Sequence, residues 1–274
     1  MTKDADISRE DFLSWALEKM NMRRRGFKKV RKQVFKRINR RMDELGIELY
    51  AGYKTHLENN PGEWKILDRM THITISRFFR DKRTWEKLAD NIIPQITQNA
   101  AENSRPVRCW SAGCASGEEP YSLAILWKEK IEPAYPGISL ELIATDADTT
   151  MLERAGKACY SMGSIKEMPV EWLNRAFHRK DQYLCLKRQY SSMVEFLLQD
   201  IRYELPDGKF DLVFCKNLVA MYFKKELATE VFNKISSKME KGAFLILGSH
   251  EEFPLDLVSN IREFNKTFNI FQRI

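Results

Sequence analysis

The chain has 274 residues, of which 43% are hydrophobic and 30% charged, and its formal net charge is +7. A chain of this size and composition can bury a substantial core, as one large domain or two small ones. It contains no run of about 18 apolar residues, so no membrane-spanning helix is expected. The polar N-terminus, MTKDADISREDF, argues against a secretory signal.

The five cysteines form no Cys-x-x-Cys pair and are accompanied by only four histidines. Neither a structural zinc site nor a disulfide framework is therefore expected. Cys109, Cys159 and Cys215 stand among apolar residues and are expected to pack as small hydrophobic side chains. This cysteine usage predicts a reduced, cytoplasmic protein without a metal site.

Residues 8–58 have the pattern of helices. The apolar residues Val30, Val34, Ile38 and Met42 recur every four residues, which predicts one apolar stripe on an otherwise basic helix. Gly46 follows where a helix C-cap is expected. A second helical stretch, roughly 63–90, follows the loop signal NNPG.

The basic residues concentrate between residues 23 and 41, where eleven Lys and Arg stand with no acid among them. This concentration predicts a surface for an acidic or polyanionic partner. Two alternatives remain open: a solvated basic face without a partner, and a nucleic-acid surface. Only Phe27 and Phe35 interleave with the basic residues, which argues against nucleic acid.

From about residue 105, short β-rich runs alternate with amphipathic helical stretches. This alternation predicts an α/β fold with a mostly parallel sheet. Residues 160–193 break it with a short helix and a hairpin-like run, which favours a small inserted subdomain. The predicted strands cover 107–112, 140–147, 194–200, 210–217 and 242–249, and 264–274 is a candidate closing edge strand.

The run WSAGCASGEEPY (110–121) leaves the first predicted strand, where open parallel sheets bind their ligands. Gly113 and Gly117 have neither the dinucleotide-binding spacing nor the P-loop ending. Glu118 and Glu119 would repel a phosphate but suit a cationic cofactor. S-Adenosylmethionine carries a sulfonium and an ammonium, and Asp146 at the end of the second strand is placed for its ribose. An ordinary tight turn with capping acids is the alternative.

Three stretches resemble the chemotaxis-receptor glutamate methyltransferases (CheR-type), over nearly the whole chain. They are ISRFFRDKRTWEKL, RCWSAGCASGEEPYSLA with the following ATDAD, and FDLVFCKNLVAMYF. The resemblance implies methyl transfer from S-adenosylmethionine to a glutamate carboxylate, with S-adenosylhomocysteine as product. It implies a helical N-terminal domain and linker helix (1–90) and a Rossmann-like methyltransferase domain (91–274) with a small inserted β-subdomain (160–193).

The resemblance also implies the cofactor contacts. Glu119, with Glu118 beside it, would face the methionine end of the cofactor. Asp146 would hold the ribose, and Asp200 and Ile201 would border the adenine. The full set is Thr74, Ser76, Arg80, Gly113, Glu118, Glu119, Asp146, Asp200, Ile201, Lys216 and Asn217, with the first three on the linker helix.

Arg80 and Tyr222 are the candidate catalytic residues. A glutamate carboxylate, with a pKa of about 4.3, is already ionised near neutral pH, so the transfer needs alignment rather than a general base. Arg80 would grip one carboxylate oxygen and Tyr222 would orient the other. The alternatives are an ion pair of Arg80 with Asp81 or Glu119, and a packed aromatic ring for Tyr222.

Three positions depart from the family pattern. Asn217 and Tyr222 are one residue further apart than usual, so that either the loop bulges or Met221 takes the tyrosine's place. Thr74 replaces an amide side chain and can make only part of its hydrogen bonds. The usual Gly-His-Ser-Glu reads Gly-Ser-His-Glu, and His250 is expected at a cap or the solvent edge.

The resemblance implies that the basic helix 23–41 docks the acidic helical cytoplasmic region of a chemoreceptor, with the protein a monomer and no membrane insertion. Two other functions stay open from the sequence. One is the same cofactor chemistry on another carboxylate or on RNA. The other is a non-catalytic, cofactor-binding interaction module.

Overall fold

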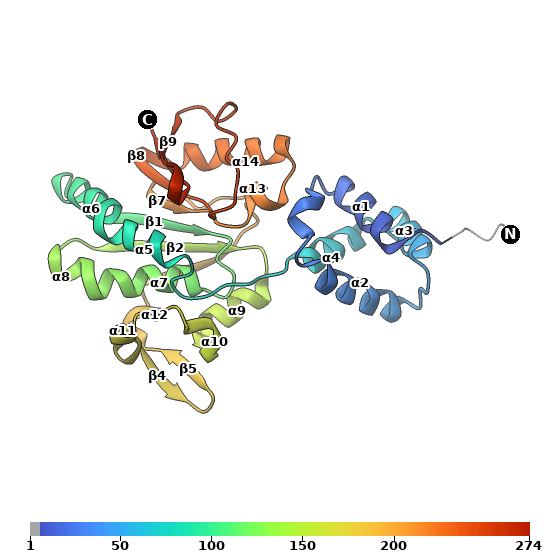
Figure 1. Ribbon diagram of the computed structural model, residues 1–274, viewed down its shortest axis with the longest axis horizontal. Helices are drawn as coiled ribbons and strands as arrows, with labels where there is room; N and C mark the ends of the chain where they lie inside the picture. Colours follow the sequence, from blue (N-terminus) through green and yellow to red (C-terminus); the bar gives the residue numbers. More distant parts are fainter. Residues whose placement is uncertain (1–5) are drawn as a thin grey trace. The chain divides into compact units, whose positions relative to one another are not determined.

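The computed structural model describes residues 6–274, so the first five residues of the polar N-terminus lie outside it (Figure 1). The chain forms two compact units. The first contains the residues up to Thr74 together with Ala220–Leu227, and the second contains Ile75–Val219 and Ala228–Ile274. Among the described residues, no helix is long and apolar enough to cross a membrane.

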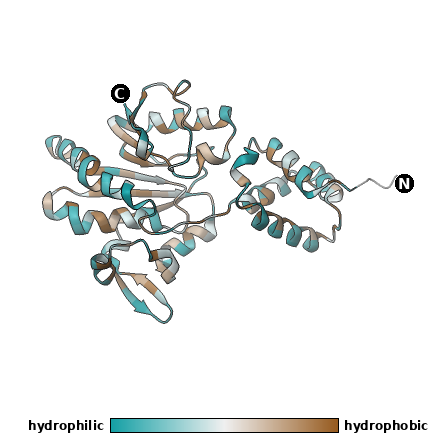
Figure 2. Cartoon of the chain, in the orientation of Figure 1, coloured by the Kyte–Doolittle hydropathy of each residue, from teal (hydrophilic) through white to brown (hydrophobic). Residues whose placement is uncertain are grey.

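The first unit is helical, as predicted. Its elements are α1 (Arg9–Lys19), the 3-10 turn η1 (Arg24–Phe27), α2 (Arg31–Leu45), α3 (Tyr50–Asn59) and α4 (Pro61–Thr71). The predicted stripe on α2 is confirmed, because Val34, Ile38 and Met42 are buried in this unit's core. Gly46 ends α2 with a φ of 67°, in the left-handed region that glycine tolerates. In Figure 2, α2 is mostly hydrophilic, with hydrophobic residues only at intervals.

The basic segment 23–41 is not one helix, contrary to the prediction. Helix α2 starts at Arg31, and the preceding residues form η1 and a turn. The backbone N–H of Arg23 donates to the carbonyl of Tyr222, and Met22 pairs with Phe223 in an antiparallel bridge. A Cβ on Gly26 would lie 2.5 Å from the Met221 carbonyl oxygen, so this close approach requires glycine.

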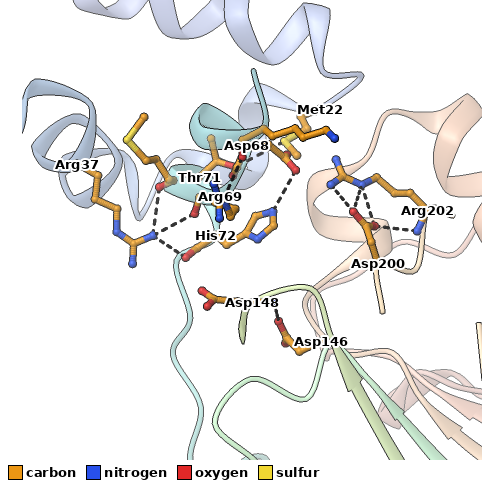
Figure 3. Close-up of polar contacts among 12 residues, drawn as sticks. Met22, Arg37, Asp68, Arg69, Thr71, His72, Asp146, Asp148, Asp200 and Arg202 are labelled. Carbon is orange, nitrogen blue, oxygen red and sulfur yellow. Dashed lines mark hydrogen bonds and ion pairs between the residues drawn. The ribbon is translucent and has the colours of Figure 1, made fainter. Parts of the chain in front are cut away.

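The predicted linker helix at Thr74 and Ser76 is also wrong. Helix α4 stops at Thr71, and residues 72–77 are in neither helix nor strand. Arg37 caps the end of this helix, since its Nη1 donates to the carbonyl of Met70 at 3.2 Å and to that of His72 at 2.8 Å; Figure 3 shows the bond to His72. The β-branched residues of the following ITI sequence also disfavour helix.

The second unit is built on a seven-stranded sheet in the order β6-β2-β1-β7-β8-β10-β9. The first five strands in this order are parallel, which confirms the α/β prediction. Their bounds are β1 (Val107–Ala112), β2 (Leu140–Asp146), β6 (Val194–Leu198), β7 (Phe210–Phe214) and β8 (Met239–Ile246). The strand order reverses between β1 and β7, where open sheets bind their ligands.

The prediction of a single closing edge strand over residues 264–274 is wrong. Residues 264–274 contain the end of β9 (Ile261–Asn265), the turn η4 (Lys266–Phe268) and β10 (Ile270–Arg273). Strand β10 lies between β8 and β9 and is antiparallel to both, so β9 is the edge. The buried Ile270 and Phe271 show why β10 takes the interior place.

Helices flank this sheet. They are α5 (Lys82–Lys87), the π-helical η2 (Leu88–Ile92), α6 (Ile93–Glu102), α7 (Glu118–Leu126), the π-helical η3 (Trp127–Ile131), α8 (Glu132–Ala134), α9 (Thr149–Lys157) and α14 (Lys225–Ser237). The short helix α13 (Val219–Tyr222) leads from this unit into the second segment of the first. Phe78, Trp85 and Leu88 are buried in the core of this unit. Residues 75–90, which the sequence division placed with the helical domain, therefore pack with the sheet.

The insertion predicted at 160–193 is a three-stranded antiparallel sheet in the order β3-β5-β4. It contains β3 (Cys159–Tyr160), α10 (Met162–Ile165), α11 (Val170–Ala176), β4 (Phe177–Lys180), β5 (Tyr183–Leu186) and α12 (Arg188–Ser191). Cys159 lies opposite Cys185 on the neighbouring strand, and the two form a disulfide. This contradicts the expectation of an unbridged Cys159 and a fully reduced chain, since only the strand register brings the pair together.

Candidate functional site

The glycine turn between β1 and α7 is held against the end of β2. The backbone N–H groups of Gly113 and Cys114 both donate to the carbonyl of Thr145, at 2.8 and 3.0 Å. Gly113 has a φ of 71°, and a Cβ there would lie 2.6 Å from Cδ2 of Leu218. Glycine is therefore needed both for the left-handed backbone and for the side chain packed over it.

Asp146 lies at the carboxyl end of β2, as predicted, and its carboxylate is fixed by backbone groups. One oxygen accepts from the N–H of Ala115 in the glycine turn at 2.8 Å, and the other from the N–H of Asp148 at 2.9 Å. Asp148 in turn caps α9. The turn thus aligns the half-buried Asp146 carboxylate at the edge where a ligand of this sheet would lie (Figure 3).

The two glutamates that begin α7 have different surroundings. Glu118 is buried, and both its carboxylate oxygens accept from the hydroxyl of Ser116, so it closes the turn on itself. Glu119 accepts instead from the hydroxyl of Ser111 on β1, at 2.8 Å. Burial raises the pKa of Glu119 above its usual 4.5, while Lys216 and the bond from Ser111 oppose that rise.

Lys216 joins this acidic group from the end of β7. Its Nζ lies 3.2 Å from Oδ2 of Asp81 and 3.8 Å from Oε2 of Glu119, and its side chain is only 6% exposed. It also donates to the carbonyl of Arg80 at 3.4 Å. The structure therefore brings together the ends of β1 and β7 and the segment before α5, which are far apart in sequence.

Arg80 is half-buried beside this group. Its Nη1 donates to the carbonyl of Ile75 at 2.9 Å, and its charge is one of those that lower the pKa of Glu119. Within residues 6–274, Arg80 forms no ion pair, so neither of the ion pairs considered from the sequence is present. Ser76 is half-buried on the same extended segment.

Asp200 and Ile201 follow β6, the strand next to β2. The backbone N–H of Gln199 donates to the carbonyl of Asp146, which places the two strand ends side by side. Asp200 pairs with Arg202 at 2.6 Å, as Figure 3 shows, and Ile201 is 6% exposed. A buried apolar side chain therefore lies beside an anchored carboxylate at this strand end, and their place beside the adenine stays a prediction.

Thr74 and Tyr222 belong to the first unit. Thr74 is exposed at the end of that unit. The ring of Tyr222 packs against Phe27, with ring centroids 5.0 Å apart, and its carbonyl accepts from Arg23. The ring of Tyr222 is therefore packed against another aromatic ring, as one of the two alternatives predicted. Its role in orienting the substrate stays a prediction.

Three site residues were not identified from the sequence: Ser111, Asp81 and Glu251. Ser111 donates to Glu119 at the start of α7, and Asp81 pairs with Lys216 after β7; neither carries a local signal. Glu251 did carry one, because it ends the Gly-Ser-His-Glu segment. The family pattern pointed only to His250 there, and His250 is exposed as expected. Glu251 is 7% exposed and accepts from the backbone of Asn217.

The donor set fits S-adenosylmethionine. A glycine turn allows close backbone approach, and the adjacent Glu119 is a half-buried carboxylate whose charge a cationic group would stabilise. The anchored Asp146 can accept from a ribose diol. The same acids would repel a pyrophosphate.

Comparison with known proteins agrees with this geometry. Residues 74–268 match the family model described as "CheR methyltransferase, SAM binding domain". A chemotaxis protein methyltransferase of Borreliella burgdorferi is 29% identical over 78% of this chain and 78% of its own. Chemotaxis protein methyltransferase 2 of Pseudomonas aeruginosa is 28% identical over 80% of this chain and 78% of its own.

Among solved structures, an S-adenosylmethionine-dependent methyltransferase from Clostridium acetobutylicum overlaps 59% of this chain and 49% of its own. It is 18% identical, with a TM-score of 0.32, which is too low to carry an argument. The family match covers residues 74–268, a range that includes the glycine turn, the strand ends and the segment before α5. The chain belongs to the CheR methyltransferase family and is an S-adenosylmethionine-dependent methyltransferase.

Proposed function

We propose that this enzyme methylates glutamate side-chain carboxylates of chemoreceptors or receptor-like signalling proteins, forming γ-methyl esters. The observation that carries the proposal is the half-buried guanidinium of Arg80, which forms no ion pair within residues 6–274 and lies close enough to Glu119 to lower its pKa. A cation in this position can bind an incoming carboxylate by charge-assisted hydrogen bonds. The family resemblance supports the same substrate.

The main task of the protein in this reaction is to align the substrate carboxylate with the methyl group. When bound, S-adenosylmethionine supplies an electrophilic methyl group. The substrate carboxylate is already ionised, so no side chain has to accept a proton. Arg80 holds one carboxylate oxygen, which keeps the attacking oxygen in line. For Tyr222, a residue of the first unit, the orienting role rests on the family resemblance alone. Such positioning is worth up to about 7–11 kcal/mol in favourable cases.

The proposed cofactor contacts belong to the second unit, except for Thr74, which ends the first segment of the first unit and is assigned from the family resemblance. Glu119, with Lys216 beside it, faces the methionine end, and Asp146 holds the ribose. Ile201 and Asp200 border the adenine. Thr74, Ser76, Gly113, Glu118 and Asn217 complete the proposed set.

The proposed docking surface contains fewer basic residues than the segment 23–41, because some of them bond within the first unit. Arg37 is used on the carbonyls that end α4, and Arg41 pairs with the buried Glu63. Four of the remaining bases, Arg31, Lys32, Lys36 and Arg40, line a groove of about 560 Å³ between α1 and α2. Its lining comprises Arg9, Glu10, Arg31, Lys32, Phe35, Lys36, Asn39, Arg40 and Asp43. We propose that acidic side chains of the receptor helix bind here.

The chemical outcome separates the candidate substrates. Tritiated S-adenosylmethionine incubated with a receptor cytoplasmic fragment should yield label that base releases as methanol, because γ-methyl esters hydrolyse in base. Base-stable label, or label on added RNA, would instead support the alternative substrates. No label on any acceptor, despite cofactor binding by calorimetry, would count against the proposed substrate class.

Arg80 is tested by its own substitution. Arg80→Ala should reduce receptor methylation at least a hundredfold while binding of S-adenosylhomocysteine changes far less. Lys82→Ala, a nearby exposed change, is the matched control and should retain activity. Full activity in Arg80→Ala would refute the gripping role.

The docking surface is tested by charge reversal. Lys32→Glu with Lys36→Glu should raise the KM for the receptor fragment and leave the cofactor KM unchanged, with a weaker salt dependence. The control pair, Lys209→Glu with Lys241→Glu, makes the same change of charge on exposed positions of the second unit. Equal effects of both pairs would argue for a nonspecific charge effect.

The proposed setting is the cytoplasm, where receptor signalling regions are reached without membrane insertion, and the proposed state is a monomer. Light scattering of the purified chain tests the second point. A molar mass near 32.2 kDa is expected, and twice that value would refute it.

A further inference from the structure

The buried carboxylate of Glu251 bridges two strand ends of the second unit. Its Oε2 accepts from the backbone N–H of Asn217, after β7, at 2.6 Å and from that of Gly248, after β8, at 2.7 Å. Bonds from N–H groups to a carboxylate are about twice as strong as those between neutral groups. Only 7% of Glu251 is exposed, so water competes little for this acceptor.

The turn that carries Glu251 is itself fixed. The N–H of Glu251 donates to the carbonyl of Gly248 at 3.0 Å. The Asn269 side chain, from the turn before β10, donates through Nδ2 to the carbonyls of both Gly248 and Glu251, each at 2.7 Å. Asn269, which directly precedes β10, therefore fixes the turn that carries the Glu251 carboxylate.

The loop that Glu251 holds borders the glycine turn on two sides. Lys216 extends toward Glu119 and Asp81, and the Leu218 side chain lies where a Cβ of Gly113 would be. Asn217, between them, has a φ of 56°, a left-handed conformation that costs energy outside glycine. An anchor on the N–H of this residue offsets that cost.

The packing at Gly248 shows how close the two loops are. A Cβ at Gly248 would lie 2.8 Å from Oδ1 of Asn217 and 2.8 Å from Oε2 of Glu251. A Cβ at Gly248 would therefore displace the ends of both side chains, so the loop after β8 lies close against the Asn217 side chain. The contact leaves the loop of Asn217 little freedom while Glu251 is ionised and in place.

We infer that Glu251 is a positioning residue for the cofactor site, which acts by holding the loop 216–218 over the glycine turn. It does not contact the cofactor or the substrate. Its effect passes through Lys216 to Glu119 and through Leu218 to Gly113. The inference rests on the proposed cofactor role of these residues. Glu251 is not itself among the proposed cofactor contacts.

The test uses the full chain with Glu251→Gln, Glu251→Ala and the neighbouring exposed control Glu252→Gln. The amide of Gln keeps one oxygen acceptor but loses the charge, so it should retain part of the function. Binding of S-adenosylhomocysteine by calorimetry should weaken about tenfold in Glu251→Gln and about a hundredfold in Glu251→Ala. Glu252→Gln should bind as the wild type does.

Hydrogen exchange provides the readout that does not depend on activity. In Glu251→Ala, the amides of Asn217 and Gly248 should exchange at least tenfold faster, whereas those of β7 should keep their protection. Faster exchange throughout the sheet would indicate general destabilisation and overturn the positioning role. Unchanged exchange and unchanged binding would overturn it too.

The two proposals fail differently. If the enzyme does not methylate receptor glutamates, the activity assay fails in the wild type, while the binding and exchange differences among the Glu251 variants persist. If Glu251 is not a positioning residue, the wild type is active and Glu251→Gln matches it in kcat and in the cofactor KM.

Discussion

The Nζ atom of Lys216 lies 3.8 Å from Oε2 of Glu119, although the two residues follow different strands. Burial raises the pKa of Glu119, and Lys216 is the strongest of the influences that lower it. The pair therefore sets how much of Glu119 is ionised at a given pH. Because a cationic ligand favours the ionised form, cofactor affinity reports this balance.

We expect affinity for S-adenosylhomocysteine, which retains the ammonium group, to fall as the pH drops from about 8 toward 5. Once the pH passes below the raised pKa of Glu119, the loss should approach about tenfold per pH unit, as for one coupled proton. Calorimetry across this range measures it. Glu119→Gln should bind weakly at all these pH values and lose the dependence, whereas the exposed control Glu153→Gln should keep it.

Replacing Lys216 by Met should shift that pH dependence upward. Without the ammonium, the pKa of Glu119 rises further, so affinity begins to fall at a higher pH than in the wild type. The same titration, repeated on Lys216→Met, gives the shift. A curve that moves to lower pH, or not at all, would show that Lys216 does not control Glu119.

In the first unit, Arg41 and Tyr53 hold the buried Glu63. Arg41 donates through Nε and Nη2 to the two carboxylate oxygens at 2.9 Å each, and the Tyr53 hydroxyl donates at 2.9 Å. The bond from Arg41 is the main cause that lowers the pKa of Glu63. Removing Arg41 leaves a buried charge, so Arg41→Met should lower the free energy of unfolding by about 3 kcal/mol.

The same group predicts a pH dependence of stability. A carboxyl group whose pKa is lowered by folding contributes fully above its unfolded pKa, near 4.5, and this contribution disappears as the pH falls through the folded pKa. Thermal unfolding between about pH 7 and 3 should show a steeper acid loss in the wild type than in Glu63→Gln. Parallel curves would contradict the assignment.

The disulfide between Cys159 and Cys185 gives a thiol count that needs no activity assay. Burial raises the pKa values of the other three thiols, Cys109, Cys114 and Cys215, so the native chain should react with no thiol reagent. Denatured without reductant it should show three thiols, and after reduction five. Five thiols without reductant would show that the bridge does not form.

Losing that bridge should destabilise the inserted sheet. It closes a loop of 26 residues, for which chain entropy predicts about 3 kcal/mol. Cys185→Ser should therefore unfold earlier than the wild type, and added reductant should lower the wild-type stability to the same level. Cys215→Ser, a buried cysteine outside the bridge, is the control whose response to reductant should match the wild type.

Much of the fold was predictable because local pattern decides it. The alternation of β-rich and amphipathic runs after residue 105 gave the parallel strands, and Gly46 and the NNPG sequence marked helix ends. The linker was not predictable in this way. Its apolar residues fit a helix, but Phe78 and Phe79 pack in the sheet core and Arg37 takes up the carbonyls where α4 stops.

The site was predictable where one segment carries the chemistry, as in the glycine turn and at Asp146. Asp81 and Glu251 were missed because their partners Lys216 and Asn217 are tens of residues away or more. Ser111 was missed although Glu119 is only eight residues away, because their contact depends on how β1 and α7 pack. The bridge between Cys159 and Cys185 was missed for the same reason, since it depends on strand register. Contacts of this kind are set by tertiary packing and leave no mark in a short window of sequence.

The helical unit is discontinuous, because the N–H of Arg23 and the carbonyl of Asn21 bond to Tyr222 and Lys224 from its second segment. A fragment that ends at Thr74 would lack those partners and leave the buried Met22 without its pairing with Phe223. Exchanging the helical unit between such enzymes thus requires two junctions, one near residue 74 and one around 220–227. Transferring only the first segment, up to Thr74, would include the basic residues of α2 but not the segment Ala220–Leu227 that completes the unit.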